Sequence, residues 1–362
     1  QKDLSLKKEL AKKIGVADID DYMYKNDKFF STEEEILKDL YKLRTSLQKR
    51  CKKLFYDNID DLYEIKTISK QNGNDIAYYI GPNDGNKNKG TFYINTLNPE
   101  KISKYSLLVL SLHEGIPGHH YEAVLNEKSN KAEYIKHNLY SSYSEGWGLY
   151  CESLFEYTND KEYYYKLQYS VERSLRLILD TGIHYYGWDK SKCFEYMKKY
   201  LKYYPDDFIN DQILRYSSNP GQALTYKIGE QVILYLKEKF MKKNNDIKAF
   251  HKLIMDIGPC PLEILIKRFH ENRFNICKMP RQTGKSTTSV SYLLHYAVFN
   301  DSTNIGILAN KAATARDLLG RLQTAYENLP KWLQQGVMTW NKGSLELENG
   351  SKILASSTSA SA

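Results

Sequence analysis

The stretch that decides the fold reads SLLVLSLHEGIPGHHYE and spans residues 106–122. An apolar run with helical spacing ends at His113 and Glu114, and a proline and a glycine then force a bend before His119 and His120. Zinc binds neutral imidazole nitrogens and carboxylate oxygens, so this pattern indicates a metal site. The proline removes the usual H-E-x-x-H spacing, and we expect a kink to bring either His119 or His120 back towards His113.

A second candidate helix supplies a further carboxylate. Residues 143–155 read YSEGWGLYCESLF and hold Glu145 and Glu152 among aromatic residues. A carboxylate from another helix commonly completes a zinc site with two histidines, so Glu145 is the candidate third ligand. Glu114 is then the candidate base that activates water. The alternative for Glu145 is a solvated carboxylate at a helix start.

Four motifs occur in order along the chain and carry a family resemblance. They are His113-Glu114-x-x-Pro117-Gly118-His119, Glu145-Gly146-Trp147-x-x-Tyr150-x-Glu152, Arg176-x-x-x-Asp180-Thr181-Gly182-Ile183-His184 and Pro220-Gly221-Gln222-Ala223-x-x-Tyr226-x-x-Gly229. Residues 1–269 thereby resemble the C-terminal half of the gluzincin-like metallopeptidase family catalogued as domain of unknown function 885 (DUF885). The resemblance implies a mainly α-helical zincin-like domain with a small β element. It also implies a Zn²⁺ cofactor and a peptide substrate that is hydrolysed.

Other residues in these motifs have candidate roles beside the metal. Arg176 and Asp180 are one helical turn apart and would support the ligands as a buried pair. The alternatives are an ordinary helix salt bridge, or an arginine that binds a substrate carboxylate. Tyr226 or His184 could stabilise an oxyanion, as hydrogen-bond donors at such sites do, or could simply pack in the core.

The N-terminal part is expected to be scaffold. It reads as amphipathic helices over residues 3–15 and 32–56 and as strands over residues 63–68, 77–80 and 91–95. By resemblance to zincins, the segment from Tyr93 to Asn95 is the candidate edge strand that holds an extended peptide. The alternative is a small structural hairpin.

The chain changes character near residue 270. Residues 272–279 read as a buried strand, and PRQTGKST over residues 280–287 is close to a phosphate loop in which Met279 replaces the first glycine. The candidate nucleotide-binding residues are Arg281, Gln282, Thr283, Gly284, Lys285 and Ser286. Lys285 would reach the phosphates of ATP and Ser286 would hold Mg²⁺. A helix over residues 290–299 and a strand over residues 305–309 are expected to follow.

Residues 270–362 resemble the N-terminal ATPase part of the large terminase subunit of T-even-like phages, a DNA-packaging motor. The residues that carry this resemblance are Asn272-Arg273-Phe274-Asn275-Ile276, Arg281-Gln282-Thr283-Gly284-Lys285-Ser286, Gly306-Ile307-Leu308-Ala309-Asn310-Lys311 and Trp340-Asn341-Lys342-Gly343-Ser344. This segment reads as a truncated α/β P-loop ATPase, because no strand ending in Asp-Glu follows. We therefore expect no ATP turnover. Two segments from unrelated families, 1–269 and 270–362, predict a chimeric chain, which could also be inactive.

The composition bears on possible partners, on disulfides and on location. The net charge is +8 over 362 residues, but lysine alternates with acidic residues and tyrosine, so nucleic acid is an expected partner only for the terminase-like tail. The five cysteines are scattered and predict free thiols. No apolar run reaches the length of a membrane span, and the first residues lack the apolar core of a signal peptide. The chain begins without Met, so we expect the natural N-terminus to be missing and leave localisation open.

Overall fold

The structure is a computed structural model that describes residues 1–57, 62–68, 76–82, 89–131, 136, 140–270 and 285–358. The chain divides into two compact units, residues 1–275 and 276–362, and each is described by itself. The first unit is mainly helical with one small sheet, as the sequence predicts. Within the described residues, no helix is long and apolar enough to cross a bilayer.

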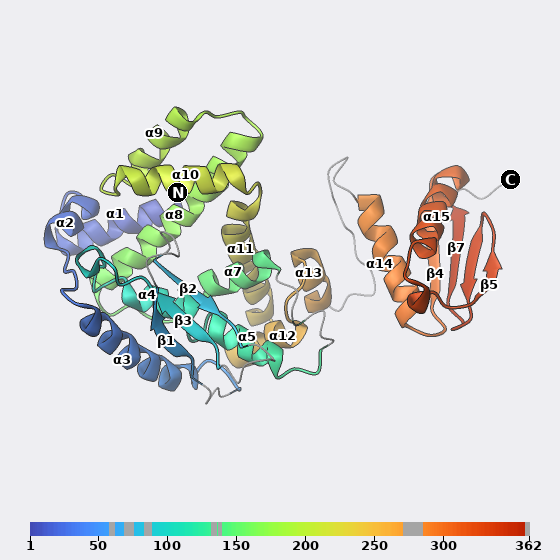
Figure 1. Ribbon diagram of the computed structural model, residues 1–362, viewed down its shortest axis with the longest axis horizontal. Helices are drawn as coiled ribbons and strands as arrows, with labels where there is room; N and C mark the ends of the chain where they lie inside the picture. The colour runs from blue at the N-terminus through green and yellow to red at the C-terminus, as the bar shows by residue number, and fades with distance from the viewer. Residues whose placement is uncertain are drawn as a thin grey trace. The chain divides into compact units, whose positions relative to one another are not determined.

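Helices make up most of the first unit (Figure 1). They are α1 (Lys2–Ile14), α2 (Ile19–Asn26), α3 (Glu33–Cys51), α4 (Leu107–Glu114), α5 (His119–Glu127), α7 (Ser141–Cys151), α8 (Asp160–His184), α9 (Lys190–Tyr200), α10 (Asp206–Ser218), α11 (Thr225–Met241), α12 (Ile247–Ile257) and α13 (Leu262–His270), with short 3₁₀ turns η1 (Pro99–Lys101) and η2 (Gln222–Leu224). The expected start of α3 is confirmed, because the Thr32 side chain accepts a hydrogen bond from the backbone N–H of Glu35. The expected end near residue 56 was too late, since the helix stops at Cys51.

The sheet of the first unit has the order β1 (Glu64–Thr67), β3 (Thr91–Ile94), β2 (Ala77–Ile80). Strand β3 is parallel to β1 and antiparallel to β2. The prediction that Tyr93 lies on an edge strand is therefore wrong. Strand spacing along the sequence cannot reveal that the third strand inserts between the first two. The edge strand that packs against α4 is β2.

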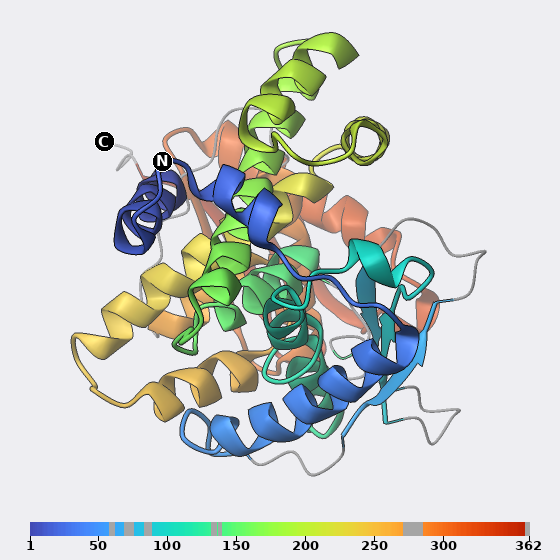
Figure 2. The same ribbon diagram turned by 90° about the vertical axis from the view of Figure 1, so that its left-hand side faces the viewer.

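The core of the first unit joins the sheet to the motif helices. It combines Phe92 and Ile94 of the sheet with residues of α3, α4 and α7, including the fully buried Trp147. Helix α8 is the long green helix of Figure 2, and α9 and α10 pack against it around a second apolar cluster. The four cysteines among the described residues are buried free thiols, as the sequence predicts.

The second unit has four strands and two helices in its described part. The helices are α14 (Lys285–Phe299) and α15 (Ala312–Glu327), followed by the 3₁₀ turn η3 (Lys331–Leu333). The strands are β4 (Asn304–Ala309), β5 (Val337–Trp340), β6 (Ser344–Leu347) and β7 (Lys352–Ser357). The sheet order is β4-β7-β6-β5, with β4 parallel to β7. This confirms the helix and the strand that were expected after residue 287, over residues 290–299 and 305–309. The helices share an apolar core with the sheet, whereas Leu308 and Leu354 remain exposed.

Candidate metal centre

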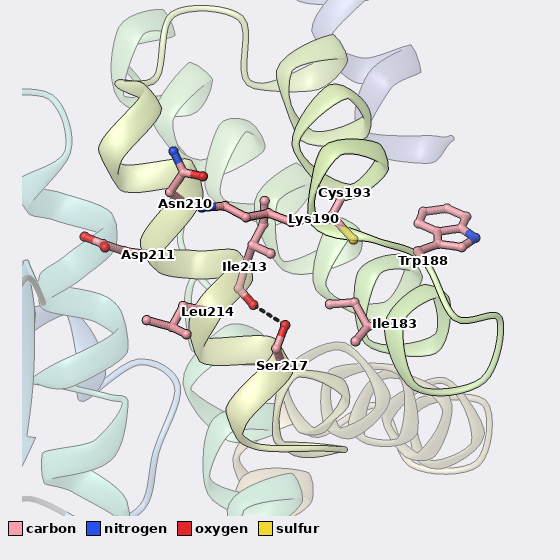
Figure 3. Close-up of a pocket in the computed structure, with 9 residues that line it drawn as sticks. All are labelled: Ile183, Trp188, Lys190, Cys193, Asn210, Asp211, Ile213, Leu214 and Ser217. Atoms are coloured by element: carbon pink, nitrogen blue, oxygen red, sulfur yellow. Dashed lines mark hydrogen bonds between the residues drawn. The ribbon is translucent and has the colours of Figure 1, made fainter.

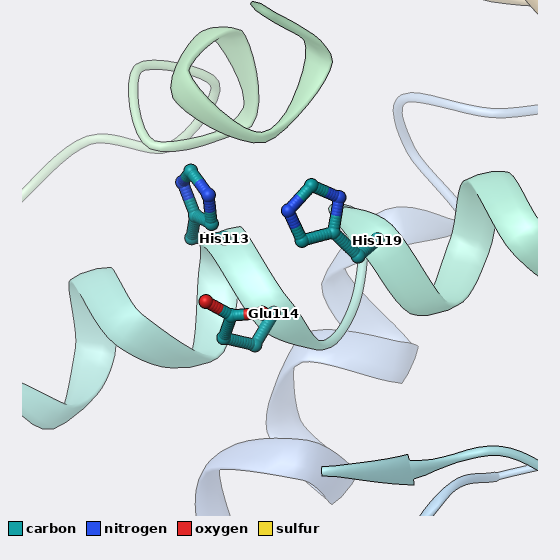
Figure 4. Close-up of side chains that lie close together, drawn as sticks. All are labelled: His113, Glu114 and His119. Carbon is teal, nitrogen blue, oxygen red and sulfur yellow. The ribbon is translucent and has the colours of Figure 1, made fainter. Parts of the chain in front are cut away.

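The turn after α4 brings two histidines together. Figure 4 shows His113 and Glu114 at the end of α4 and His119 at the start of α5, with the two imidazole rings beside each other. The ring centroids are 4.8 Å apart and the rings are nearly perpendicular. A side chain at position 118 would collide with the backbone carbonyl of His113, so the turn is this tight only because residue 118 is glycine.

Helix α7 adds Glu145 to the two histidines. One Glu145 carboxylate oxygen lies 3.4 Å from Nε2 of His113 and 3.7 Å from Nε2 of His119. The glycines beside it make room for this approach. A Cβ at Gly148 would lie 2.8 Å from the His113 ring, and one at Gly146 would lie 2.5 Å from the Gly229 backbone of α11. The Glu-Gly-Trp-Gly sequence is thus explained by close packing.

These separations fit the geometry of a tetrahedral zinc site. Zinc–nitrogen and zinc–oxygen bonds of about 2.0–2.1 Å imply roughly 3.3 Å between neighbouring ligand atoms of a tetrahedron. The two distances from Glu145 are close to this value. Glu114 is also near, since a ligand atom from each of His113, Glu114 and His119 lies within 4.8 Å of the others. Glu145 is the carboxylate in contact with both Nε2 atoms.

A buried carboxylate orients the first histidine. Nδ1 of His113 lies 2.8 Å from an oxygen of Glu152, which is 2% exposed. A proton on Nδ1, donated to Glu152, would leave Nε2 of His113 able to bind a cation on the side where Glu145 and His119 lie. A second carboxylate that fixes the tautomer of a ligating histidine is a common feature of zinc sites. The sequence contained Glu152 in a quoted motif but did not indicate this role, because the contact joins two separate helices.

His119 is connected to a carboxylate through a serine hydroxyl. Nδ1 of His119 lies 3.2 Å from the hydroxyl of Ser144, and that hydroxyl donates to Glu122 over 2.7 Å. His119 can thus donate from Nδ1 to Ser144 and keep the lone pair of Nε2 for a cation. Ser144 and Glu122 were not predicted, and their only sequence signal is that they lie close to ligand positions.

Opposite charges stabilise each other where Glu145 meets the two histidines. Burial would raise the pKa of Glu145, but hydrogen bonds with His113 and His119 hold it well below its usual range. Burial would lower the pKa of both histidines, but their carboxylate neighbours raise it above the ordinary value. Burial raises the pKa of Glu114, which suits a group that accepts a proton from water.

His120 does not belong to this centre. Its Nδ1 lies 2.9 Å from the hydroxyl of Tyr79 on β2, and its side chain is completely buried. The alternative that the sequence left open is therefore decided by the direction in which α5 starts. His119 meets His113, and His120 points towards the sheet.

A cavity of about 290 Å³ opens beside the centre. Its lining includes His113, Glu114, His119, Glu145 and Tyr226, so these predicted residues share one space. The edge strand β2 and helices α8 and α10 form other parts of its wall.

The two predicted supporting residues, Arg176 and Asp180, do not pair with each other. Arg176 lines the cavity but pairs with Glu172 at 2.9 Å instead of with Asp180. Asp180 accepts a hydrogen bond from the backbone N–H of Gly221, which links two of the motifs. The predicted Arg176–Asp180 pair is therefore wrong, because helical spacing allows a partner in either direction and tertiary contacts select one.

Two further candidates do not line this cavity. Nε2 of His184 lies 2.9 Å from the backbone oxygen of Tyr216, so this imidazole joins the end of α8 to α10. Tyr93 stacks on Tyr78 within the sheet, with ring centroids 4.9 Å apart. Neither is among the residues that surround the two metal-site histidines.

A second cavity, of about 260 Å³, lies among α8, α9 and α10 (Figure 3). Its described lining mixes apolar side chains such as Trp188 and Ile213 with the single charges of Lys190 and Asp211. No group of imidazoles and carboxylates comparable to the first cavity is present among these described residues.

The candidate phosphate loop falls mainly outside the described residues. Arg281, Gln282, Thr283 and Gly284 are not described, and Lys285 is described only as the first residue of α14. Ser286 is half-buried in the first turn of that helix. Nucleotide binding by this segment stays a prediction.

Comparison with known proteins decides the family of the first unit. Residues 4–268 match the family model described as bacterial protein of unknown function (DUF885). The chain belongs to this family. The match lies in the N-terminal part of this chain, and it does not confirm the expectation that the segment is the C-terminal half of a longer member. Residues 276–362 match the model of the N-terminal part of the T4likevirus-type terminase large subunit, as predicted.

Two solved structures have the same fold as the first unit. A candidate lipoprotein from Colwellia psychrerythraea is 25% identical, with a TM-score of 0.69, and the match covers 75% of this chain and 50% of that one. A candidate lipoprotein of unknown function from Shewanella oneidensis is 16% identical, with a TM-score of 0.58, and the match covers 67% of this chain and 46% of that one. The chain thus spans about half the length of these relatives.

Proposed function

We propose that the DUF885 unit is a zincin-like, zinc-dependent peptidase in which His113, His119 and Glu145 hold the metal. The observation that carries this proposal is the position of one Glu145 oxygen within 3.4 Å and 3.7 Å of the two Nε2 atoms. The orientation of His113 by the buried Glu152 supports it, because a second carboxylate of this kind is typical of zinc ligands. When bound, zinc would polarise a carbonyl group and lower the pKa of water.

The residues around the metal have separate roles in this proposal. Glu114 takes a proton from water as the new C–O bond forms at the peptide carbonyl. It then passes that proton to the nitrogen as the C–N bond breaks, so that an acid and an amine leave. Tyr226 lines the same cavity, and Arg215 donates to its hydroxyl over 3.1 Å. The phenol therefore keeps its own proton to donate to the developing oxyanion.

The edge strand supplies a place for the peptide backbone. Strand β2 lines the cavity, and its second edge pairs with no described strand. An extended peptide could add to that edge with main-chain hydrogen bonds. This assignment to β2 replaces the earlier prediction for Tyr93. Because both solved relatives are described as candidate lipoproteins, we include a location outside the cytoplasm in the proposal.

The decisive experiment measures metal and activity on the full chain. We expect about one zinc per chain, loss of zinc in Glu145→Ala, and retention of zinc in Glu114→Gln. Peptide hydrolysis in Glu114→Gln should fall by a factor of about 10²–10⁴, because that range is typical for loss of general acid–base catalysis. A folded chain that takes up no zinc, or a Glu114→Gln variant with full activity, would refute the proposal.

The terminase match favours a second, separate candidate for residues 276–362. Nucleotide binding there would use the Lys285 ammonium and the helix start at α14, where backbone N–H groups attract phosphate. We propose binding of ATP with Mg²⁺ and no turnover. Retention of labelled ATP by the full chain, and its loss in Lys285→Ala, is the test.

A further inference from the structure

One wall of the metal-site cavity is rich in arginine. Arg173 and Arg176 project from α8, and Arg215 projects from α10 into the same lining. Of these, only Arg176 is a candidate site residue from the sequence. The wall lies in the cavity that also holds His113 and Glu145, so a ligand at the metal centre would meet these guanidinium groups.

The three arginines of this wall have different hydrogen-bond partners. Arg176 pairs with Glu172, whereas the hydrogen-bond partners of Arg215 are the Tyr226 hydroxyl at 3.1 Å and the Gln222 side-chain oxygen at 3.5 Å. Arg173 donates weakly to a backbone oxygen at 3.5 Å. Within the described part of the chain, no carboxylate lies at ion-pair distance from Arg173 or Arg215.

Two of these guanidinium groups have a buried donor that no described residue satisfies. Arg176 is 6% exposed, and Nε of both Arg176 and Arg173 is buried with no hydrogen-bond partner among the described residues. Buried donors of this kind are normally satisfied by a hydrogen-bond partner. Gln212 adds another donor, because its side-chain oxygen accepts from Tyr216 and its amide N–H groups remain for a ligand.

We propose that Arg215, together with Arg173 and Arg176, binds the free C-terminal carboxylate of a short peptide substrate. A guanidinium group matches a carboxylate through two parallel hydrogen bonds, and Arg215 has no competing carboxylate. The cavity volume of about 290 Å³ is at the lower end of the range for small-ligand pockets, which favours a short substrate. The inference rests on the proposed peptidase function and makes the enzyme one that cleaves near a peptide C-terminus.

The test begins with binding to the zinc-free full chain, so that it does not depend on catalysis. We would compare acetyl-Ala-Ala with a free carboxylate, the same dipeptide as its C-terminal amide, and the acetylated amide of glutamate, by calorimetry. The free dipeptide should bind at least tenfold more tightly than both amides. Equal binding of the two dipeptides would overturn the proposal. Preferential binding of the glutamate amide would also overturn it, since the carboxylate would then come from a side chain.

Variants locate the carboxylate within the cavity. Arg215→Gln should remove most of the preference for the free carboxylate, and in the zinc-loaded chain it should raise KM more than it lowers kcat. Arg321→Gln is the matched control, because this exposed residue of α15 pairs with Asp317 in the other unit. An unchanged preference in Arg215→Gln would refute the role of Arg215. The ligand comparison in the unmodified chain remains decisive even if the variant unfolds.

The outcomes separate this inference from the proposed function. A chain that holds zinc and cleaves free and amidated peptides equally would refute the carboxylate site alone. A chain that binds the free carboxylate through Arg215 but takes up no zinc would refute the peptidase proposal and support the anion site.

Discussion

Two buried histidines of the first unit have opposite surroundings. His113 is 4% exposed and contacts the carboxylates of Glu145 and Glu152. His251 is fully buried, and its ring nitrogens contact the Tyr150 hydroxyl and a backbone carbonyl, each at 2.8 Å. His251 also stacks on Phe55, with ring centroids 4.4 Å apart. One histidine is surrounded by negative charge and the other by neutral, mostly aromatic groups.

The two environments shift the pKa in opposite directions. Burial lowers the pKa of both imidazoles, and for His251 it prevails and brings the pKa to about 4. For His113 the two carboxylates outweigh burial and the pKa is raised. Burial alone therefore does not mark a histidine as a metal ligand. The carboxylates beside it distinguish a site that favours a cation from a core position that excludes one.

The largest expected difference between the two histidines is in zinc binding. His113→Ala should reduce zinc from about one per chain to a negligible level, because it removes one of three ligands. His251→Asn should lose stability but keep its zinc, since no ligand is touched. Metal analysis of the monomeric fraction of each purified variant measures this.

His120→Gln provides a closer control for that experiment. This residue is adjacent to the ligand His119 and is buried, but it contacts Tyr79. Loss of zinc from a folded His120→Gln chain, together with retention in His113→Ala, would reverse our assignment of the ligands.

The next effect is a pH dependence that belongs to His251. Its folded pKa of about 4 lies below the unfolded value of about 6.5, so protons bind the unfolded chain more readily. Its contribution to stability is complete above pH 6.5 and is lost as the pH falls towards 4. Between pH 7 and pH 5 the free energy of unfolding should fall by about 2 kcal/mol through this group.

Urea unfolding of the wild type and His251→Asn at both pH values isolates that contribution. The variant should lose about 2 kcal/mol less than the wild type over the same interval. Identical losses in the two chains would contradict the buried neutral imidazole. The zinc-free His113 has a raised pKa, so its own contribution has the opposite sign and is lost as the pH rises through the folded pKa.

A smaller effect should come from the carboxylate behind His113. Glu152→Gln keeps the size of the side chain but weakens its hold on Nδ1 of His113. We expect zinc affinity to fall by a factor of about 10–100, as for other carboxylates that orient a ligating histidine. Competition with a chelator measures the affinity, and an unchanged value would show that His113 needs no such support.

The sequence predicts the helices of this site better than it predicts their contacts. The apolar run before His113 and the cap at Thr32 are local signals, and the helix that each one marks begins where expected. The choice between His119 and His120 depends on the exact path of a short turn, which spacing does not determine. Glu152 is visible in a motif, but its partner lies 39 residues away on another helix.

The same limit explains the errors beyond the metal centre. Tyr93 was predicted to lie on an edge strand. The strand order in the sheet differs from the order along the chain, and it places β3 between β1 and β2. Arg176 has an acidic residue one helical turn away on each side, Glu172 and Asp180. In the folded chain it pairs with Glu172, because Asp180 accepts a hydrogen bond from the backbone N–H of Gly221. Arg215 carried no motif signal, because its importance comes from the cavity to which α10 brings it.

The smallest expected effect tests whether the second unit contributes to the chemistry at all. Lys285→Ala changes the first residue of α14, in the compact unit of residues 276–362, and all assigned zinc ligands lie in the other unit. Zinc content and peptide hydrolysis should therefore equal those of the wild type within error, while any retention of ATP should disappear. Parallel assays of metal, peptide cleavage and labelled ATP on one preparation measure all three quantities. A loss of zinc or of cleavage in Lys285→Ala would mean that the two units depend on each other, and the contrast between His113 and His251 would no longer suffice to explain the metal centre.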